Sequence, residues 1–133
     1  MLPPAIGILS ACLKKAGHKV ELFDTTQYAT FDLAYRPKVD VDKSKADRLM
    51  AKPFEKSESL SEIYTDIFDD WEKKVNTFKP DIIALSATED LWLPGIELLK
   101  RTREKKILTI AGGVFPTFAP DLAIMYDEID LIC

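Results

Sequence analysis

The residues best suited to ligand chemistry are two hydroxyls and a pair of glycines. Ser86 and Thr88 close one short apolar run, and Gly112 and Gly113 close another. A hydroxyl can hydrogen-bond a buried ring nitrogen, and glycines without a Cβ leave flat space for a macrocycle or a flavin ring. The same residues are also typical of turns and helix caps that bind nothing. Both interpretations stay open at this point.

The two apolar runs have the composition of buried strands. Ile82–Ser86 is one, and Ile107–Ala111, polar only at Thr109, is the other. Strands that alternate with helices predict an α/β fold, a three-layer sandwich with a parallel sheet covered on both faces. Right-handed crossovers place the carboxyl ends of both strands on one rim. We therefore expect the hydroxyls and the glycines to face one crevice.

The same patterns predict the other elements. In chain order they are a helix from Pro3 to Ala16 ended by Gly17, a strand from His18 to Phe23, a helix from Ser59 to Val75 opened by a Ser59–Glu62 capping box, a helix from about Pro94 with a basic end at Arg101–Lys106, a helix from about Pro120 to Tyr126, and a strand from Ile129 to Cys133. The polar stretch from Thr25 to Lys56 is long enough to suggest a lid or binding loop.

Composition excludes several classes of function. The 133 residues suit one domain, and a net charge of −4 argues against a nucleic-acid partner. No apolar stretch is long enough to cross a bilayer, so no membrane partner is expected. Cys12 and Cys133 are the only cysteines and form no C-x-x-C pair. A reduced, cytoplasmic setting follows as the default.

No catalytic or metal-ligating constellation stands out. His18 is the only histidine, and it follows a helix-ending glycine on the rim opposite the crevice. A Ser/His or Cys/His dyad would have to use that one residue. Glu89 and Asp90 lie near the rim, but solvated acidic loop residues are common. The carboxylates between Glu62 and Glu72 fit the outward stripe of an amphipathic helix, so we assign no metal ligand.

Several segments together resemble a known domain. They are Pro3-Pro-x-x-Gly7, Leu13-Lys-Lys-Ala-Gly17-His18-x-Val20-x-x-Phe23-Asp24, Lys79-Pro-Asp-Ile-Ile-Ala-Leu-Ser86, Ala111-Gly-Gly-x-x-Pro-Thr117 and Glu128-Ile-Asp130-Leu-Ile-Cys133. Their order and spacing resemble the N-terminal cobalamin (B12)-binding domain of B12-dependent radical SAM proteins. The resemblance covers nearly the whole chain outside residues 25–56.

The resemblance implies a flavodoxin-like (Rossmann-like) domain that holds cobalamin at the rim. It implies a downstream radical SAM domain, with S-adenosylmethionine and a [4Fe-4S] cluster, that performs methyl transfer or ring rearrangement, so this chain alone is not expected to be catalytic. The matching positions divide into a group near the nucleotide tail of the cofactor and a group against the tail and the corrin edge. They are Ser86, Ala87 and Thr88 in the first group, and Gly112, Gly113, Val114, Pro116 and Thr117 in the second.

The chain departs from that family in several ways. It has no D-x-H-x-x-G motif and no C-x-x-x-C-x-x-C cluster motif, and Phe115 stands where the family often has histidine. It also begins at Pro3-Pro4, where relatives already have a first strand. We expect residues 1–133 to be a single domain from a longer radical SAM protein, with an exposed sheet edge that permits oligomers.

Two other classes remain as alternatives. One is a degenerate domain that keeps the fold and binds nothing, serving a structural or interaction role. The other is a flavin-binding or receiver-like module with a similar sheet. A receiver needs an aspartate where this chain has Ser86, and a flavodoxin needs a hydroxyl-rich loop after its first strand, which is not found here.

Overall fold

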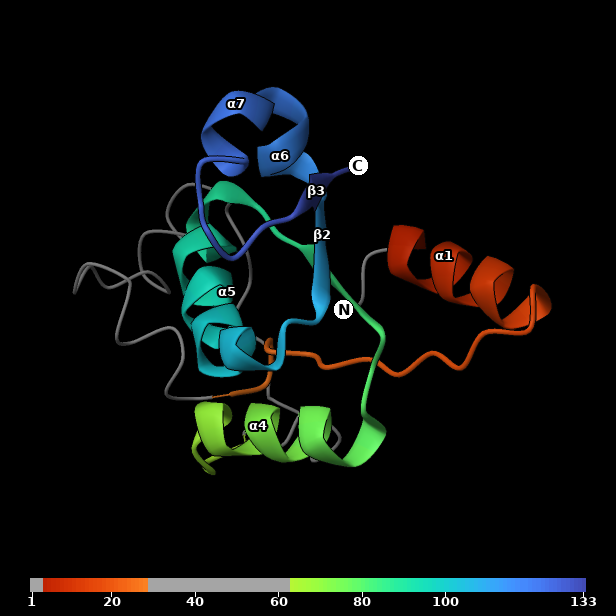
Figure 1. Ribbon diagram of the computed structural model, residues 1–133. Helices are drawn as coiled ribbons and strands as arrows, with labels where there is room; N and C mark the ends of the chain where they lie inside the picture. The colour runs from red at the N-terminus through yellow and green to blue at the C-terminus, as the bar shows by residue number, and fades with distance from the viewer. Residues whose placement is uncertain (1–3, 29–62) are drawn as a thin grey trace, which may run out of the picture.

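The computed structural model describes residues 4–28 and 63–133, which form an α/β fold with an all-parallel open sheet of order β1-β2-β3 (Figure 1). The predicted flavodoxin-like (Rossmann-like) fold class is confirmed. The elements are α1 (Pro4–Lys15), α4 (Ile67–Phe78), β1 (Ile82–Ser86), α5 (Glu89–Thr102), the 3₁₀ turn η1 (Arg103–Lys105), β2 (Leu108–Gly112), α6 (Val114–Phe118), α7 (Pro120–Ala123) and β3 (Leu131–Ile132).

Helix α1 ends where the sequence predicts, in a glycine-centred cap. Gly17 has a φ of 92°, a conformation that favours glycine. The His18 N–H donates to the Leu13 carbonyl at 3.0 Å, and the Gly17 N–H donates to the Lys14 carbonyl at 3.1 Å. These two bonds form a Schellman motif, which satisfies carbonyls that the last turn of a helix leaves free.

Helix α4 begins later than the predicted start at Ser59, and that prediction is wrong. Its N-cap is Asp66, whose carboxylate accepts from the backbone N–H groups of Phe68 at 2.7 Å and Asp69 at 3.1 Å. Upstream of the cap, the backbone is engaged elsewhere, because Ile63 forms a bridge with Tyr28. The expected Ser59–Glu62 capping box lies outside the described residues, as do residues 29–56 of the predicted lid.

Helix α5 starts at Glu89, five residues before the predicted start near Pro94. Thr88 occupies the N-cap position, and Pro94 lies inside the helix. A proline there removes one N–H from the helical ladder, and tertiary packing overrides that local cost, since Pro94 is buried. The predicted apolar face of α5 and its basic end are confirmed; they comprise Ile96, Leu98 and Leu99, and Lys100, Arg101 and the following Arg103–Lys105.

The core lies on one face of the sheet. Helix α5 lies to one side of β2 and α1 to the other, with α4 below them (Figure 1), but α1 buries none of its residues. Exposure therefore alternates along β1, and Ile82 is 51% exposed. The prediction of strands buried on both faces is wrong, because the helix expected to cover the second face does not pack against it.

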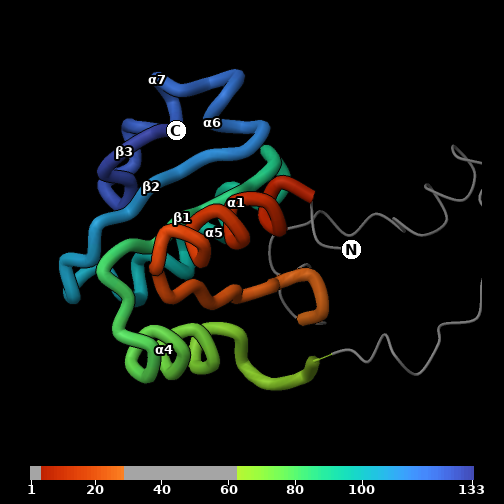
Figure 2. Tube along the Cα trace, turned by 90° about the vertical axis from the view of Figure 1, so that its right-hand side faces the viewer, coloured from red at the N-terminus to blue at the C-terminus, as the bar shows by residue number. Residues whose placement is uncertain are grey.

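The segment from His18 to Phe23 is not a strand, contrary to prediction. It is extended (Figure 2), but its residues form no ladder with β1 or with any other described strand. It is attached to α4 instead. The Phe23 ring meets the Trp71 ring edge-on at 5.2 Å between centroids, and Glu21 forms an ion pair with Lys74. The alternating pattern was correct for an extended backbone, yet a strand also needs a neighbour with which to pair.

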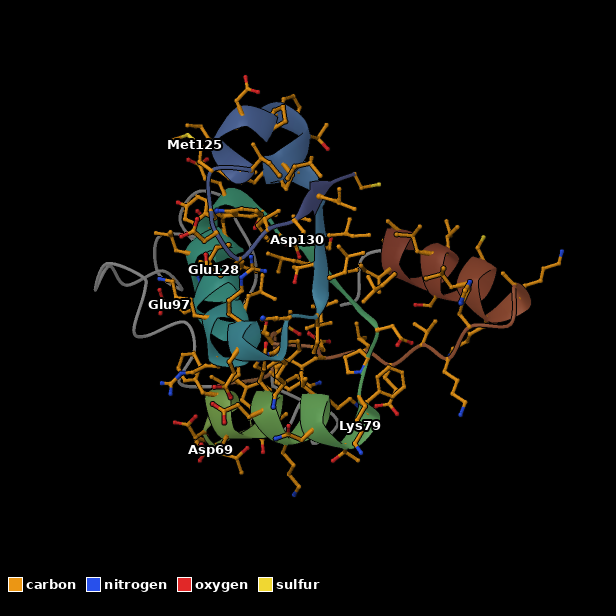
Figure 3. All side chains as sticks on the ribbon, viewed as in Figure 1. Asp69, Lys79, Glu97, Met125, Glu128 and Asp130 are labelled. Carbon is orange, nitrogen blue, oxygen red and sulfur yellow. The ribbon has the colours of Figure 1, made fainter. Side chains whose placement is uncertain are left out.

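The carboxyl-terminal segment contains a shorter helix and a shorter strand than predicted. Strand β3 spans two residues of the expected Ile129–Cys133, and α7 covers only the first part of the expected Pro120–Tyr126 helix. Asp130 extends the connection to β2, since its carboxylate accepts from the Thr109 N–H at 2.7 Å and its own N–H donates to the Thr109 carbonyl at 3.0 Å (Figure 3).

The hydrogen bonds between Asp130 and Thr109, here called the Asp130 anchor, predict that the stability of the fold depends on pH. The hydrogen bond from the Thr109 N–H, together with Arg103 nearby, lowers the pKa of Asp130 below its ordinary value of 3.8. A lowered pKa stabilises the folded state above pH 3.8, and the stabilisation is lost as the pH falls through the folded-state pKa. We expect Asp130→Asn to reduce the slope of unfolding free energy against pH below about 4. Urea titrations at several pH values measure it.

The matched control is Asp127→Asn, an exposed carboxylate three residues earlier. Asp70 also has a lowered pKa, owing to hydrogen bonds from Thr65 and Tyr28, so the slope should shrink rather than vanish. Equal slopes for Asp130→Asn and Asp127→Asn would contradict the role assigned to the anchor.

No helix in the described ranges 4–28 and 63–133 has the length and apolar character required to cross a membrane.

Candidate functional site

The ends of β1 and β2 meet on one rim, as predicted. Ser86 pairs with Gly112 in the parallel register. Beyond that pair, the Ala87 N–H donates to the Gly112 carbonyl at 3.3 Å, and the Phe115 N–H donates to the Ala87 carbonyl at 3.3 Å. The two strand ends are thus joined by backbone hydrogen bonds and do not diverge.

Glycine occupies positions 112 and 113 for different structural reasons. Gly113 has a φ of 96°, and a Cβ there would lie 3.0 Å from the Ala87 carbonyl oxygen and 3.1 Å from the Ser86 Oγ. The chain itself therefore requires glycine at this position. A Cβ on Gly112 would meet only the Cβ of Cys133, at 3.7 Å, an ordinary contact. Gly112 is the one of the pair that leaves space open.

A cavity of about 480 Å³ reaches the rim and runs back along β1. Five of the eight predicted site residues line it, namely Ser86, Ala87, Thr88, Gly113 and Val114. The other three do not: Gly112 lies beside it in β2, Pro116 is fully buried, and the Thr117 hydroxyl donates to the Gly113 carbonyl at 2.7 Å. The structure thus brings together the β1 end and the start of α6.

The rim hydroxyls are available to a ligand. Ser86 and Thr88 are both exposed, and neither side chain has a hydrogen-bond partner among residues 4–28 and 63–133. Thr88 occupies the N-cap position of α5 without a side-chain capping bond. The cap interpretation is therefore right for its backbone, while its hydroxyl remains free. Glu89 and Asp90, in the first turn of α5, are exposed and complement the helix dipole.

The most perturbed titratable groups lie away from the rim, where Tyr28 meets α4. Burial, with a hydrogen bond of 3.0 Å to Asp70, raises the pKa of Tyr28 to about 12. This pair ties the segment ending at Tyr28 to α4. Asp69 lies on the outer side of that helix (Figure 3), and no group of three or more potential metal ligands occurs among the described residues. Of the carboxylates expected on the outward stripe, Asp69 is exposed, whereas Asp66 caps α4 and Asp70 accepts from Tyr28 and Thr65.

Sequence reasoning missed most of the cavity wall. One side is the extended segment Glu21–Thr26, and the floor comes from α4 and α5, including Trp71, Val75, Leu98 and Leu99. The available signal was the apolar stripe of each helix, which predicts that this face is buried but does not indicate the segment against which it packs. Helix α6 was also missed, since no helix was expected between the glycine-ended strand and Pro120.

Comparisons with models of protein families, with curated proteins and with solved structures found no match. The structure defines an α/β domain with an open parallel sheet and a cavity that reaches its carboxyl rim.

Proposed function

We propose that the chain is a cobalamin-binding module that holds the cofactor at the carboxyl rim of its sheet. The observation that carries the proposal is the cavity beside the hydroxyls of Ser86 and Thr88, which have no partner within the described part of the chain, next to Gly113 and Val114. Ligands of open α/β sheets bind in the crevice outside the carboxyl ends of the strands. The motif resemblance described above supports this choice of ligand.

The residues present fit part of such a cofactor. A cavity of about 480 Å³ is within the range of small-molecule sites, and it suits a nucleotide tail rather than a whole corrinoid. Ser86 and Thr88 offer hydroxyls to the tail, and Gly113, which also lines the cavity, adds no side chain beside Ser86. Val114 is 57% exposed on α6 and offers an apolar contact to the macrocycle outside.

Bound cobalamin would supply a cobalt centre for methyl transfer or radical chemistry. The residues of this chain bind and orient it and are not themselves catalytic. The partner that fits is a downstream radical SAM domain with S-adenosylmethionine and a [4Fe-4S] cluster.

A non-binding structural domain is the second candidate, and the geometry of Gly113 favours it. Both its positive φ and its approach to Ala87 are explained without a ligand. Phe115, where the family often has histidine, packs on Trp92 at 4.8 Å between ring centroids. Gly113 and Phe115 therefore have roles that folding alone explains.

Hydroxocobalamin distinguishes the two candidates. Under the proposal, the pigment co-elutes with the chain in gel filtration, and Ser86→Leu weakens its affinity at least about tenfold, about 1.4 kcal/mol. The leucine removes the hydroxyl and fills the cavity mouth. Thr77→Leu, an exposed hydroxyl position on α4 outside the cavity, should leave affinity unchanged. Absence of co-eluting pigment, or equal affinities for Ser86→Leu and the wild type, would reject cobalamin binding at this rim.

A further inference from the structure

The outer side of the α6–α7 pair exposes large apolar side chains. Phe118 is 85% exposed, Met125 is 76% exposed and Leu122 is 58% exposed. The inner side of the pair is buried in the core through Pro116 and Ala123. The fold is thus completed without the three larger side chains, which remain in solvent. Exposed apolar side chains that gather in one place, with polar groups around them, mark an interaction site.

Helical geometry brings these three side chains close together. The helical turn continues past the end of α7, because the Ile124 N–H donates to the Pro120 carbonyl at 3.0 Å and the Met125 N–H to the Leu122 carbonyl at 3.3 Å. Leu122 and Met125 are three residues apart in this turn and therefore lie on one side of it. Phe118 is the last residue of α6, directly before the α6–α7 connection.

The polar groups around these side chains carry charge of one sign. Every charged side chain in residues 107–133 is acidic, namely Asp121, Asp127, Glu128 and Asp130. Asp130 pairs with Arg103, whereas the other three form no ion pair within the part of the chain that the structure describes. Met125 and Glu128 project from the same side of the molecule (Figure 3). The α6–α7 face is defined here as Phe118, Leu122 and Met125 with the carboxylates Asp121, Asp127 and Glu128.

The backbone of this face is already satisfied by its own helices. The Ala119 N–H donates to the Phe115 carbonyl at 2.9 Å, and the Ala123 N–H donates to the Ala119 carbonyl at 3.0 Å. An added strand would find no row of free donors and acceptors here. The occupant must therefore satisfy its own backbone groups, as an α-helix does. Met125 suits such a contact, because a flexible thioether side chain adapts to an apolar partner.

We propose that the α6–α7 face binds a basic amphipathic helix of a partner polypeptide. The apolar stripe of that helix covers Phe118, Leu122 and Met125, and its Lys and Arg side chains lie opposite the carboxylates of the face. Charge complementarity selects this occupant, because acidic groups around an apolar contact favour a cationic partner and disfavour an anionic one.

Two other occupants are poorer. A second copy of this chain, docked through the same face about a two-fold axis, would set carboxylates against carboxylates. A lipid surface is attracted by Lys and Arg around an apolar face, and this face has neither. The proposal goes beyond cobalamin binding, because no residue of the α6–α7 face lines the cavity assigned to the cofactor tail.

The probe is a blocked peptide of about four helical turns, Lys-Leu-Lys-Ala-Leu-Leu-Lys-Lys-Leu-Ala-Lys-Leu-Leu-Lys, added to the 133-residue chain without cobalamin. Its leucines form one stripe and its lysines the opposite face. We expect it to shift the NMR signals of the Met125 methyl group and the Phe118 ring. A control peptide with glutamate in place of every lysine should bind at least about tenfold more weakly.

A pair of equally exposed leucines provides the matched variants. Leu122 is 58% exposed on α7, and Leu9 is 59% exposed on α1, which lies apart from α7 in both Figure 1 and Figure 2. Leu122→Ser should weaken affinity for the basic peptide at least about fivefold, because it removes apolar area from the contact, and Leu9→Ser should leave it unchanged. Phe118→Ser should weaken it at least about tenfold.

Several outcomes would overturn the proposal. They are equal affinities for Leu122→Ser and Leu9→Ser, equal binding of the acidic peptide, NMR shifts confined to residues outside the α6–α7 face, sedimentation of the chain with phosphatidylserine vesicles in place of peptide binding, and a dimer of the chain in gel filtration. None of these measurements involves cobalamin, so their results are independent of the cofactor test.

Discussion

Replacing Trp92 with alanine should lower the free energy of unfolding by about 3–5 kcal/mol. Trp92 is 2% exposed, and its ring lies 4.8 Å from that of Phe115 and 5.7 Å from that of Tyr126, between centroids. Truncation leaves a cavity where α5, α6 and the segment after α7 meet, and the surrounding backbone cannot close it fully. Equilibrium urea unfolding followed by circular dichroism measures the loss.

Two variants separate packing from other effects. The Trp92 Nε1 is buried with no hydrogen-bond partner in the described part of the chain, so Trp92→Phe loses volume without losing a bond and should cost well under half as much. Leu93→Ala, at the adjacent exposed position, should change stability by less than about 0.5 kcal/mol. A Trp92→Ala variant as stable as Leu93→Ala would contradict the packing of α6 on α5.

Gly113→Ala should destabilise the fold by about 2–4 kcal/mol. The backbone at Gly113 has φ 96° and ψ −166°, a region that side chains rarely tolerate. The added Cβ would also lie within 3.1 Å of the Ala87 N and O atoms, which belong to backbone and cannot rotate away. Thermal and urea unfolding should show the loss without any ligand present.

Gly112→Ala is the control that the chain itself provides. Its φ is not positive, and its Cβ would have room beside Cys133. We expect a change below about 1 kcal/mol, the usual scale for a glycine-to-alanine exchange in a strand. Equal destabilisation by both substitutions would show that the strand ends do not approach each other as described.

The parts of the fold that depend on local chemistry could be predicted from sequence. The apolar run Ile82–Ser86 is β1 with the predicted bounds, and β2 is displaced by one residue. Gly17 ends α1 because a left-handed cap needs a residue without a side chain. The meeting of Ser86 and Gly112 on one rim follows from right-handed parallel connections, which few sequences violate.

The parts of the fold that depend on a neighbouring segment could not be predicted from sequence. His18–Phe23 has the alternation of a strand, but pairing needs a neighbour, and the place beside it is the cavity. The apolar stripe of α1 predicts a covered sheet face, yet Leu9 is 59% exposed. For the site, the rim hydroxyls were predictable from strand ends, whereas the cavity behind them lies where no strand of the described ranges pairs with His18–Phe23. A local sequence pattern indicates which face of a segment can be buried, but it does not indicate whether another segment packs against that face.

The alternation along β2 has a consequence for how the sheet is aligned. Thr109 and Ala111 point into the core, while the larger and more apolar Leu108 and Ile110 occupy the less buried positions. Sliding β2 by one residue would exchange the two sets and would be favoured by hydrophobicity alone. Side-chain volume opposes that slip, because the larger Leu and Ile would have to replace Thr109 and Ala111 on the core face. The hydrogen bonds between Asp130 and Thr109 oppose it as well. The alignment of β2 is therefore fixed by steric fit and by specific hydrogen bonds rather than by the hydrophobicity of its side chains.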